Sequence, residues 1–191
     1  EDFGRTWRRR DGSLIPQAAT GETIDVIAVG SRSPGKLSHK CGTIAVDREG
    51  TPIVVYSAAN ASTSEMIVAS PEGRSGWKRQ GLAAAVAGHA PGWRIGPAAE
   101  VVVNQEGTMY ISATMARQGH NDIALIKSRD LGRTISIERP AAGVDRTRKW
   151  LPNLERPTGQ HAVRGRPGLI FTAGVRGEGN KDILENDVYW A

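Results

Sequence analysis

Val46-Asp47-Arg48-Glu49-Gly50-Thr51-Pro52-Ile53-Val54-Val55-Tyr56-Ser57 is the stretch that decides the fold of this chain. It aligns with Val103-Asn104-Gln105-Glu106-Gly107-Thr108-Met109-Tyr110-Ile111-Ser112-Ala113-Thr114, which begins 57 positions later. A weaker third copy, Gly165–Ala173, matches Gly50–Ala58 at an offset of 115. Each copy has an apolar strand, a turn of acidic or amide residues ending in glycine, and a second apolar strand. This pattern predicts antiparallel hairpins.

Two further strands are expected after each of the first two hairpins. The third strand is predicted at Glu65–Ser70 and Asp122–Ser128, and the fourth at Trp77–Gln80 and Thr134–Glu138. Four antiparallel strands that repeat at this spacing are typical of a β-propeller blade. We therefore expect an all-β propeller with about 3 to 4 blades in this chain. The predicted division is 1–36 for the end of one blade and a connecting loop, then blades at 37–81, 82–139 and 140–191.

The composition agrees with strands and tight turns and favours an acidic partner. The 191 residues include 23 glycines and 10 prolines, and no helix-length periodic apolar stretch is present. The formal net charge of +5 favours a polyanion such as an acidic polysaccharide or a nucleic acid. Nucleic acid is disfavoured, because the sequence carries neither a basic helix nor an aromatic RNA-binding signature.

The sequence also bears on disulfide bonds, metal sites, membrane spans and cellular location. Cys41 is the single cysteine, so an intrachain disulfide and a cysteine-rich zinc motif are excluded. No cofactor is expected, although scattered histidines leave a structural metal open. No stretch is long and apolar enough to span a bilayer, so we expect no membrane partner. A secreted or periplasmic location is expected, and a signal peptide could precede this sequence.

A short motif recurs between the predicted third and fourth strands. Ser128-Arg129-Asp130-Leu131-Gly132-Arg133-Thr134-Ile135 fits Ser-x-Asp-x-Gly-x-Thr-aromatic except at its last position. Asp2-Phe3-Gly4-Arg5-Thr6-Trp7 is the same motif without its serine, and Ser70–Trp77 is a degenerate version in which Glu72 replaces the aspartate. The acidic position precedes the aromatic position by five residues in all three copies.

This sequence resembles the Asp-box, or BNR-repeat, propellers of sialidases and several polysaccharide-degrading families. In such a motif the carboxylate and hydroxyls bond backbone amides of a tight turn, while the aromatic residue packs between sheets. The resemblance therefore implies a structural role, away from the chemistry, for Asp2, Gly4, Thr6, Trp7, Ser128, Asp130, Gly132 and Thr134.

A narrower resemblance is to the BNR-repeat subfamily that includes ulvan lyases, which cleave rhamnose–glucuronate linkages. It is carried by four segments: Trp7–Gly12, Cys41–Asp47, Leu151–Arg156 and Asn186–Trp190. It implies β-elimination on an acidic polysaccharide, with a histidine and tyrosine pair near an arginine.

The repeat length predicts an incomplete ring. A spacing of 57 residues gives this chain fewer blades than the roughly 4 to 8 of a closed propeller. We expect that missing N-terminal blades or another chain complete the ring, and that this sequence is a C-terminal portion. An open stack would otherwise expose strand edges and apolar faces.

Propeller connectivity places the candidate site on one face. The loops that follow each second and fourth strand share this face, and the Asp-box turns fall on the opposite one. Aromatic, arginine and amide side chains in these loops suit a sugar ring that bears a carboxylate. The expected substrate-binding residues are His89, Trp93, Arg117, Gln118, Asn121 and Trp150.

The predicted chemistry needs a carboxylate clamp, a base for the C5 proton and an acid for the leaving oxygen. The candidate catalytic residues are His39 or His120 as base or acid, and Arg94 or Arg156 as clamp. His39 and Arg156 are expected near the starts of innermost strands. Structural roles stay open for both histidines, and Tyr56 is expected to pack in the core because it aligns with Phe171. A sialidase-like hydrolase and a noncatalytic glycan- or protein-binding propeller are the alternatives.

Overall fold

The structure is a computed structural model of the 191-residue chain. It describes residues 5–16, 19–20, 22, 24–30, 38–60, 64–74, 76–144, 148–158, 161–174 and 186–191. The predicted Asp-box residues Asp2 and Gly4 lie outside the described residues.

The described residues form antiparallel sheets and one short helix. A small sheet pairs β1 (Trp7–Arg8) with β2 (Leu14–Ile15). The first large sheet holds β3 (Ser38–Val46), β4 (Pro52–Ala59), β5 (Ser64–Glu72) and β6 (Gly76–Gly81). After helix α1 (Ala83–His89), the second large sheet holds β7 (Arg94–Val103), β8 (Met109–Arg117), β9 (His120–Ser128) and β10 (Ser136–Glu138). The third large sheet holds β11 (Arg148–Leu154), β12 (Leu169–Gly174) and β13 (Asn186–Trp190).

The repeated turns form as their sequence predicts. The side-chain oxygens of Asp47 and Asn104 accept hydrogen bonds from the amides two and four residues further on, at 2.7–3.0 Å. Gly50 and Gly107 close these turns with φ of 80° and 77°, a conformation that glycine adopts without steric cost. Local turn chemistry therefore fixes the two aligned hairpins in the same way.

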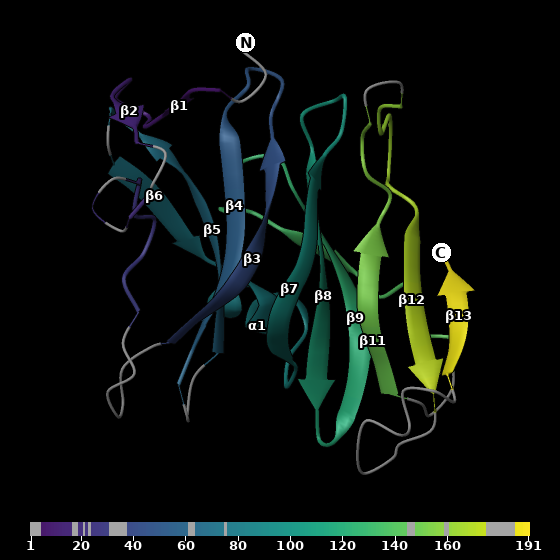
Figure 1. Cartoon of the computed structure of the whole chain (residues 1–191). Helices are drawn as coiled ribbons and strands as arrows, with labels where there is room; N and C mark the ends of the chain where they lie inside the picture. Colours follow the sequence, from purple (N-terminus) through teal and green to yellow (C-terminus); the bar gives the residue numbers. More distant parts are fainter. Residues whose placement is uncertain are drawn as a thin grey trace.

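The three large sheets stand side by side in chain order, as Figure 1 shows. Their first strands β3, β7 and β11 are neighbours from one sheet to the next. An apolar core lies between the first and second sheets, where Val55 and Met66 pack with Ile111 and Met115. A second core lies between the second and third sheets. The predicted all-β, propeller-like fold is confirmed, and the described residues form three large sheets of it.

Each large sheet uses alternate residues for its two faces. We call the face toward the next sheet in chain order the forward face, and the other the backward face. Val55 lies on the forward face of the first sheet. Tyr110 lies on the forward face of the second sheet, against Phe171 on the backward face of the third. Full burial of such side chains contributes roughly 1.5–3 kcal/mol each, so the period-two pattern holds neighbouring sheets together.

Two segments differ from the sequence prediction. The alignment of the third copy predicts the turn between its first and second strands at His161, but the first strand, β11, already ends at Leu154, and residues 155–168 connect it to β12. Between the predicted fourth strand at Trp77–Gln80 and β7, the structure forms helix α1, which the sequence analysis did not predict. Helix α1 has only seven residues and buries Val86 alone among them, so it carries no helical periodicity that sequence analysis could detect.

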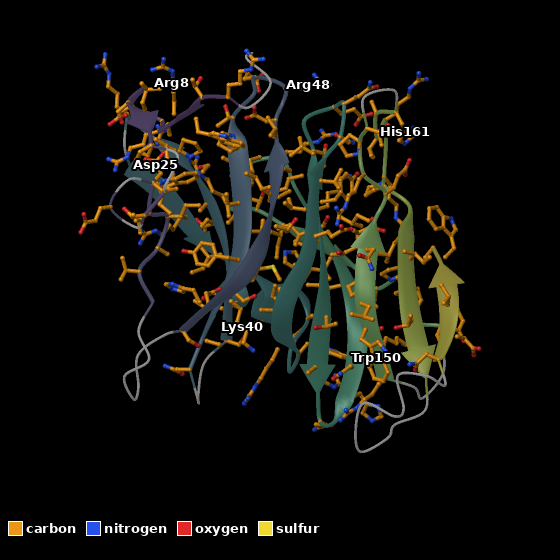
Figure 2. The ribbon with its side chains drawn as sticks, in the orientation of Figure 1. Arg8, Asp25, Lys40, Arg48, Trp150 and His161 are labelled. Atoms are coloured by element: carbon orange, nitrogen blue, oxygen red, sulfur yellow. The ribbon has the colours of Figure 1, made fainter. Side chains whose placement is uncertain are left out.

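Because the strands are antiparallel, the connections between them lie at two opposite ends of the sheets. We call one end the loop face; it carries α1, the β8–β9 turn and the β10–β11 connection. We call the other end the turn face; it carries the hairpin turns at 47–50 and 104–107. Figure 2 shows Lys40 and Trp150 near the loop face and Arg48 and His161 at the turn face. The turn at 128–134 follows β9 and therefore belongs to the turn face, as predicted.

Candidate functional site

A pocket of about 280 Å³ opens on the loop face where the second and third sheets meet. Its walls come from the end of the α1–β7 connection, the β8–β9 turn, the β10–β11 connection and the start of β11. The lining residues are Trp93, Arg117, Gln118, His120, Asn121, Asp122, Arg139, Ala142, Val144 and Lys149.

The β8–β9 turn presents two of these side chains. Gln118 and Gly119 alone join the strands, and their φ values are 47° and 80°. Positive φ at both central residues is typical of a two-residue hairpin turn that matches strand twist. Arg117 and His120 are consequently direct cross-strand partners, which places both side chains on the same face of the sheet.

Asp122 is the buried centre of the polar lining. Its Oδ1 accepts a hydrogen bond from Lys149 Nζ at 3.1 Å, and its Oδ2 accepts one from Arg139 Nε at 2.7 Å. The side chains of Asp122 and Lys149 are 2% and 7% exposed. A buried charge needs such partners, since desolvation is costly. Asp122 therefore joins the end of β10 and the start of β11 to β9.

Trp93 supports the cationic side of the pocket. The Arg139 and Arg117 guanidinium carbons lie 4.5 Å and 5.5 Å from its ring centroid. Gly92, with φ of 79°, precedes Trp93, and a Cβ there would contact Arg117 Cδ at 3.5 Å. Cation–π attraction holds guanidinium groups at such distances. Trp93 was expected to stack on a sugar, but in this structure its ring engages two arginines.

The pocket has an excess of positive charge. Arg117, Arg139 and Lys149 provide three cations, and Asp122 provides the one carboxylate among the described lining residues. Arg139 and Lys149 are engaged by Asp122, whereas Arg117 has no ion pair with the described part of the chain. The arrangement can therefore accept an anion, with the Arg117 guanidinium as its first contact.

Five of the predicted site residues meet in this pocket. They are Trp93, Arg117, Gln118, His120 and Asn121. Asp122, Arg139 and Lys149 were not among the predicted site residues. One available signal was Asp122 itself, a charged residue placed directly before the apolar run Ile123–Ile126. Its partners lie 17 and 27 positions away, and no local spacing connects them.

The other predicted site residues lie outside the pocket lining. His89 ends α1 and is exposed, and Arg94 begins β7 and is exposed. Trp150 is the neighbour of Lys149 in β11, so its side chain points to the opposite face of the third sheet. Roles for these residues in binding or catalysis stay predictions.

Arg156 does not lie at the start of an innermost strand, so that expectation is wrong. It follows the end of β11 on the turn-face side and forms an ion pair with Glu100 of β7. Glu100 is 3% exposed and also accepts a hydrogen bond from the Leu154 amide. The error arises because the first strand of the third sheet lies earlier in the sequence than the alignment predicts, at Arg148–Leu154, so Arg156 follows its end.

His39 does lie at the start of an innermost strand, the second residue of β3. Its ring meets the Tyr56 ring edge-on with centroids 5.3 Å apart, and its Nδ1 is buried without a hydrogen-bond partner. Burial raises the pKa of Tyr56 above its ordinary value, and the Arg79 charge opposes that rise. This pair lies on the backward face of the first sheet, separate from the pocket. Tyr56 is buried, as predicted for a packing residue.

The turn at 128–134 forms the expected hydrogen bonds. Asp130 Oδ1 accepts from the Thr134 amide at 2.9 Å, and Ser128 Oγ accepts from the Gly132 amide at 2.8 Å. Ile135, at the aromatic position of the motif, packs in the core between the first and second sheets. Trp7, at the aromatic position of another copy of the motif, was also expected to pack between sheets, but its side chain is 67% exposed in the described structure.

The described residues show neither a metal-binding cluster nor a membrane-spanning helix. They contain no group of three or more histidine, cysteine, aspartate or glutamate side chains arranged to hold a metal ion. They also include no helix of the length and apolarity needed to cross a bilayer.

Comparisons with known proteins relate this chain to solved structures. No protein-family description and no curated protein matches the sequence. One similar structure comes from GH130, a family of mannoside phosphorylases containing glycoside hydrolases that target β-1,2-mannosidic linkages in Candida mannan. It matches with 15% identity and a TM-score of 0.52 over 91% of this chain and 57% of the other. A candidate glycoside hydrolase from Parabacteroides distasonis matches with 14% identity and a TM-score of 0.49, over 80% and 50% of the two chains.

The first of these structures shows a shared fold. This chain spans 57% of its length, so the two proteins share a part of a larger β-sheet architecture. The narrower resemblance to ulvan lyases is not tested by these matches and stays a prediction.

Proposed function

We propose that this chain is part of a carbohydrate-active propeller whose loop-face pocket binds an acidic saccharide and cleaves it by β-elimination. The observation that carries the proposal is the group of Arg117, Arg139, Lys149 and His120 in one pocket. The saccharide part of the proposal is supported by the structural neighbour from a family of mannoside phosphorylases and glycoside hydrolases.

The charge of the pocket supports a uronic acid as the bound sugar. An arginine guanidinium pairs with a carboxylate through parallel N–H donors, which adds geometric specificity to charge attraction. Arg117 is exposed and unpaired with any carboxylate of the described residues, so it can meet a substrate carboxylate. Arg139 and Lys149 are held by Asp122 and add a fixed positive field behind it.

Elimination at a uronic acid uses these groups in a defined order. Cation pairing with the carboxylate stabilises the negative charge that develops as the C5 proton leaves. In this proposal His120, which lines the pocket, is the general base that takes that proton. The C4–O bond then breaks, a C4–C5 double bond forms, and the departing oxygen takes a proton from the imidazolium or from water.

Hydrolysis by a pair of carboxyl groups fits this pocket less well. Glycosidases of that kind need one carboxyl as acid and a second as base or nucleophile. Asp122 is the one carboxylate of the described lining, and both of its oxygens are engaged by cations. The described lining also holds no tyrosine for a sialidase-type nucleophile.

The same cations favour a second candidate function, phosphorolysis of a glycoside. Inorganic phosphate would then be the anion that Arg117 and Lys149 bind, in place of a substrate carboxylate. A noncatalytic role in binding acidic glycans is the third possibility, because one fold hosts both enzymes and binding proteins.

One experiment separates these functions. The protein is incubated with uronate-containing polysaccharides, and ultraviolet absorbance of unsaturated uronate, reducing ends and phosphate-dependent sugar phosphate are measured in parallel. We expect new absorbance that is lost in His120→Ala and strongly reduced in Arg117→Ala. Arg164→Ala removes an exposed arginine of the β11–β12 connection and is the matched control.

Each alternative outcome has a distinct meaning. Reducing ends without absorbance would indicate hydrolysis, and sugar phosphate would indicate phosphorolysis. Saturable binding without any product would indicate a binding protein. Full activity of both pocket variants would place the chemistry elsewhere, and His39→Ala then tests the His39–Tyr56 pair.

A further inference from the structure

Two arginines of the loop-face pocket lie close together without a shared carboxylate. The guanidinium carbon of Arg139 lies 4.5 Å from the ring centroid of Trp93, and that of Arg117 lies 5.5 Å from the same centroid. Because both distances end at one ring, the two guanidinium groups are close neighbours. Like charges at short range repel each other unless anions compensate them. The pair therefore favours a ligand with more than one negative group.

Arg139 uses only one edge of its guanidinium inside the protein. Its Nε and Nη2 donate hydrogen bonds to Oδ2 of Asp122. Its Nη1 has no acceptor among the described residues, and the side chain is 41% exposed. A guanidinium binds a carboxylate through two parallel N–H donors. The Nη1–Nη2 edge of Arg139 can therefore bind a ligand carboxylate while Asp122 holds the other edge.

Arg117 provides a separate contact for an anion. It is the last residue of β8, lies directly opposite His120 of β9, and is exposed. Asp122 binds Arg139 and Lys149, whereas Arg117 has no ion pair with the described part of the chain. An anion bound at Arg117 thus leaves the outer edge of Arg139 unused, so the pocket has two anion contacts.

The charge of the lining calls for the same number of anions. With His120 neutral, the described lining holds the cations Arg117, Arg139 and Lys149 and the single carboxylate of Asp122. Asp122 compensates one cation, and two positive charges remain. A saccharide with one carboxylate would compensate one of them and partly desolvate the other, which costs free energy. A saccharide with two carboxylates compensates both.

The β10–β11 connection adds a small apolar surface to the same pocket. Ala142 is exposed there, and Val144 is half-buried against the core between the second and third sheets. Ligand pockets commonly combine apolar walls with a few polar groups that fix orientation. These two side chains can contact the C–H face of a sugar ring in place of Trp93, whose ring engages the arginines.

We propose that this pocket binds two neighbouring uronic acid residues of one polysaccharide chain. The inference rests on the proposed function, because it concerns the same pocket and an acidic saccharide. Arg117 pairs with the carboxylate of the residue that loses its C5 proton to His120. Arg139, held by Asp122, pairs with the carboxylate of the adjacent residue. The substrate class is then a polyuronate, rather than a polysaccharide in which uronic acids alternate with neutral sugars.

Binding of three disaccharides to the whole chain tests this proposal. They are digalacturonic acid, an aldobiouronic acid with one uronic acid and one neutral sugar, and a neutral disaccharide. Titration calorimetry measures each affinity. We expect digalacturonic acid to bind roughly tenfold more tightly than the aldobiouronic acid, because it adds one charge-assisted pair. This advantage should shrink as sodium chloride is added, since salt screens the pair.

The outcomes separate this inference from the proposed function. Equal affinity for the two acidic disaccharides, with both bound more tightly than the neutral one, would overturn the two-anion inference and leave the proposed function intact. Equal affinity for all three would overturn both.

Substitution of the arginines tests which side chain makes the second contact. Arg139→Gln removes the charge and should abolish the preference for digalacturonic acid over the aldobiouronic acid, whereas Arg117→Gln should weaken the binding of both. Arg164→Gln, an exposed arginine of the β11–β12 connection, is the matched control and should keep the wild-type preference.

A second variant covers the case in which Arg139→Gln does not fold. Arg139→Lys keeps a positive charge for Asp122 but lacks the second edge of N–H donors. It should also lose most of the preference for digalacturonic acid. A wild-type preference in a folded Arg139 variant would refute the role of Arg139.

Discussion

Lys149 of the third sheet donates a hydrogen bond from Nζ to Oδ1 of Asp122 in the second sheet, over 3.1 Å between two buried side chains. This ion pair crosses from β11 to β9 beneath the pocket, and Arg139 binds the other carboxylate oxygen. The same carboxylate therefore stabilises the packing of two sheets and sets the positions of two pocket cations.

Replacing Asp122 should destabilise the fold more than a typical polar substitution. Asp122→Ala leaves Lys149 buried without its counter-charge, and breaking such pairs costs about 3–5 kcal/mol. Urea unfolding measures the change in the free energy of unfolding. The double variant Asp122→Ala with Lys149→Met should recover part of this loss. Equal stability of Asp122→Ala and wild type would show that the pair contributes nothing.

Trp93 should strengthen ligand binding because its ring holds Arg117 and Arg139 in position. Trp93→Leu removes the ring that lies under Arg117 and Arg139. Each cation–π contact contributes about 0.5–1 kcal/mol at exposed sites, so the affinity for an acidic saccharide should fall several-fold. Titration calorimetry with a uronate oligosaccharide measures this effect. Trp77→Leu, outside the pocket, should bind as wild type does, and an unchanged affinity in Trp93→Leu would contradict the prediction.

Ser128 should stabilise the turn that follows β9. Its Oγ accepts the Gly132 amide hydrogen at 2.8 Å, and Ser128 is 3% exposed. Ser128→Ala leaves that amide without its partner, which costs about 1–3 kcal/mol for a buried donor. Thermal and urea unfolding measure the loss. Ser136→Ala, at an exposed position of β10, should change little. A similar loss in both variants would argue against a specific role for the turn.

Glu155 should make stability depend on pH in the acid range. The Gly168 amide and then His161, both hydrogen-bonded to its carboxylate, lower the pKa of Glu155 below its ordinary value. A lowered folded-state pKa contributes stability above the unfolded value, and that contribution is lost as the pH falls through the folded pKa. Glu155→Gln should therefore be less stable than wild type at neutral pH, with the difference shrinking in acid. Unfolding curves over a pH series measure this, and a constant difference would refute it.

Two glycines should respond oppositely to alanine. Gly107 has φ of 77° and open space around the position of a Cβ, so Gly107→Ala adds backbone strain alone, about 1–2 kcal/mol. Gly88 lies in α1, also with open space, and Gly88→Ala should add up to about 1 kcal/mol of stability from helix propensity. Urea unfolding of both variants checks the two signs, and a loss in both would contradict the second.

Short-range features were predictable because neighbouring residues determine them. The turns at Asp47 and Asn104 were found from their acidic or amide residue and their glycine, and the structure shows the corresponding side-chain hydrogen bonds. The third strand at Asp122–Ser128 lies within β9. Helix α1 and the position of β11 were missed, since neither carries a strong periodic signal.

The candidate site was predictable only in part. One turn carries four of the predicted residues, Arg117, Gln118, His120 and Asn121. The position of that turn in the repeat therefore predicts that all four lie on the same face. Trp93 was grouped with them because the connection after a fourth strand shares their face. The Asp122 contacts were not predictable, because Arg139 and Lys149 come from separate elements whose spacing depends on how the third sheet packs.

The sequence by itself determined the repeat, the hairpins, the all-β class and the face that carries the loops. These properties depend on period-two apolar alternation and on turn chemistry, which act over a few residues. The tertiary structure alone decided that Lys149 meets Asp122, that two arginines cover Trp93, and that Arg156 pairs with Glu100. Those contacts join residues from different elements, and only the packing of sheet on sheet brings their charged groups within bonding distance.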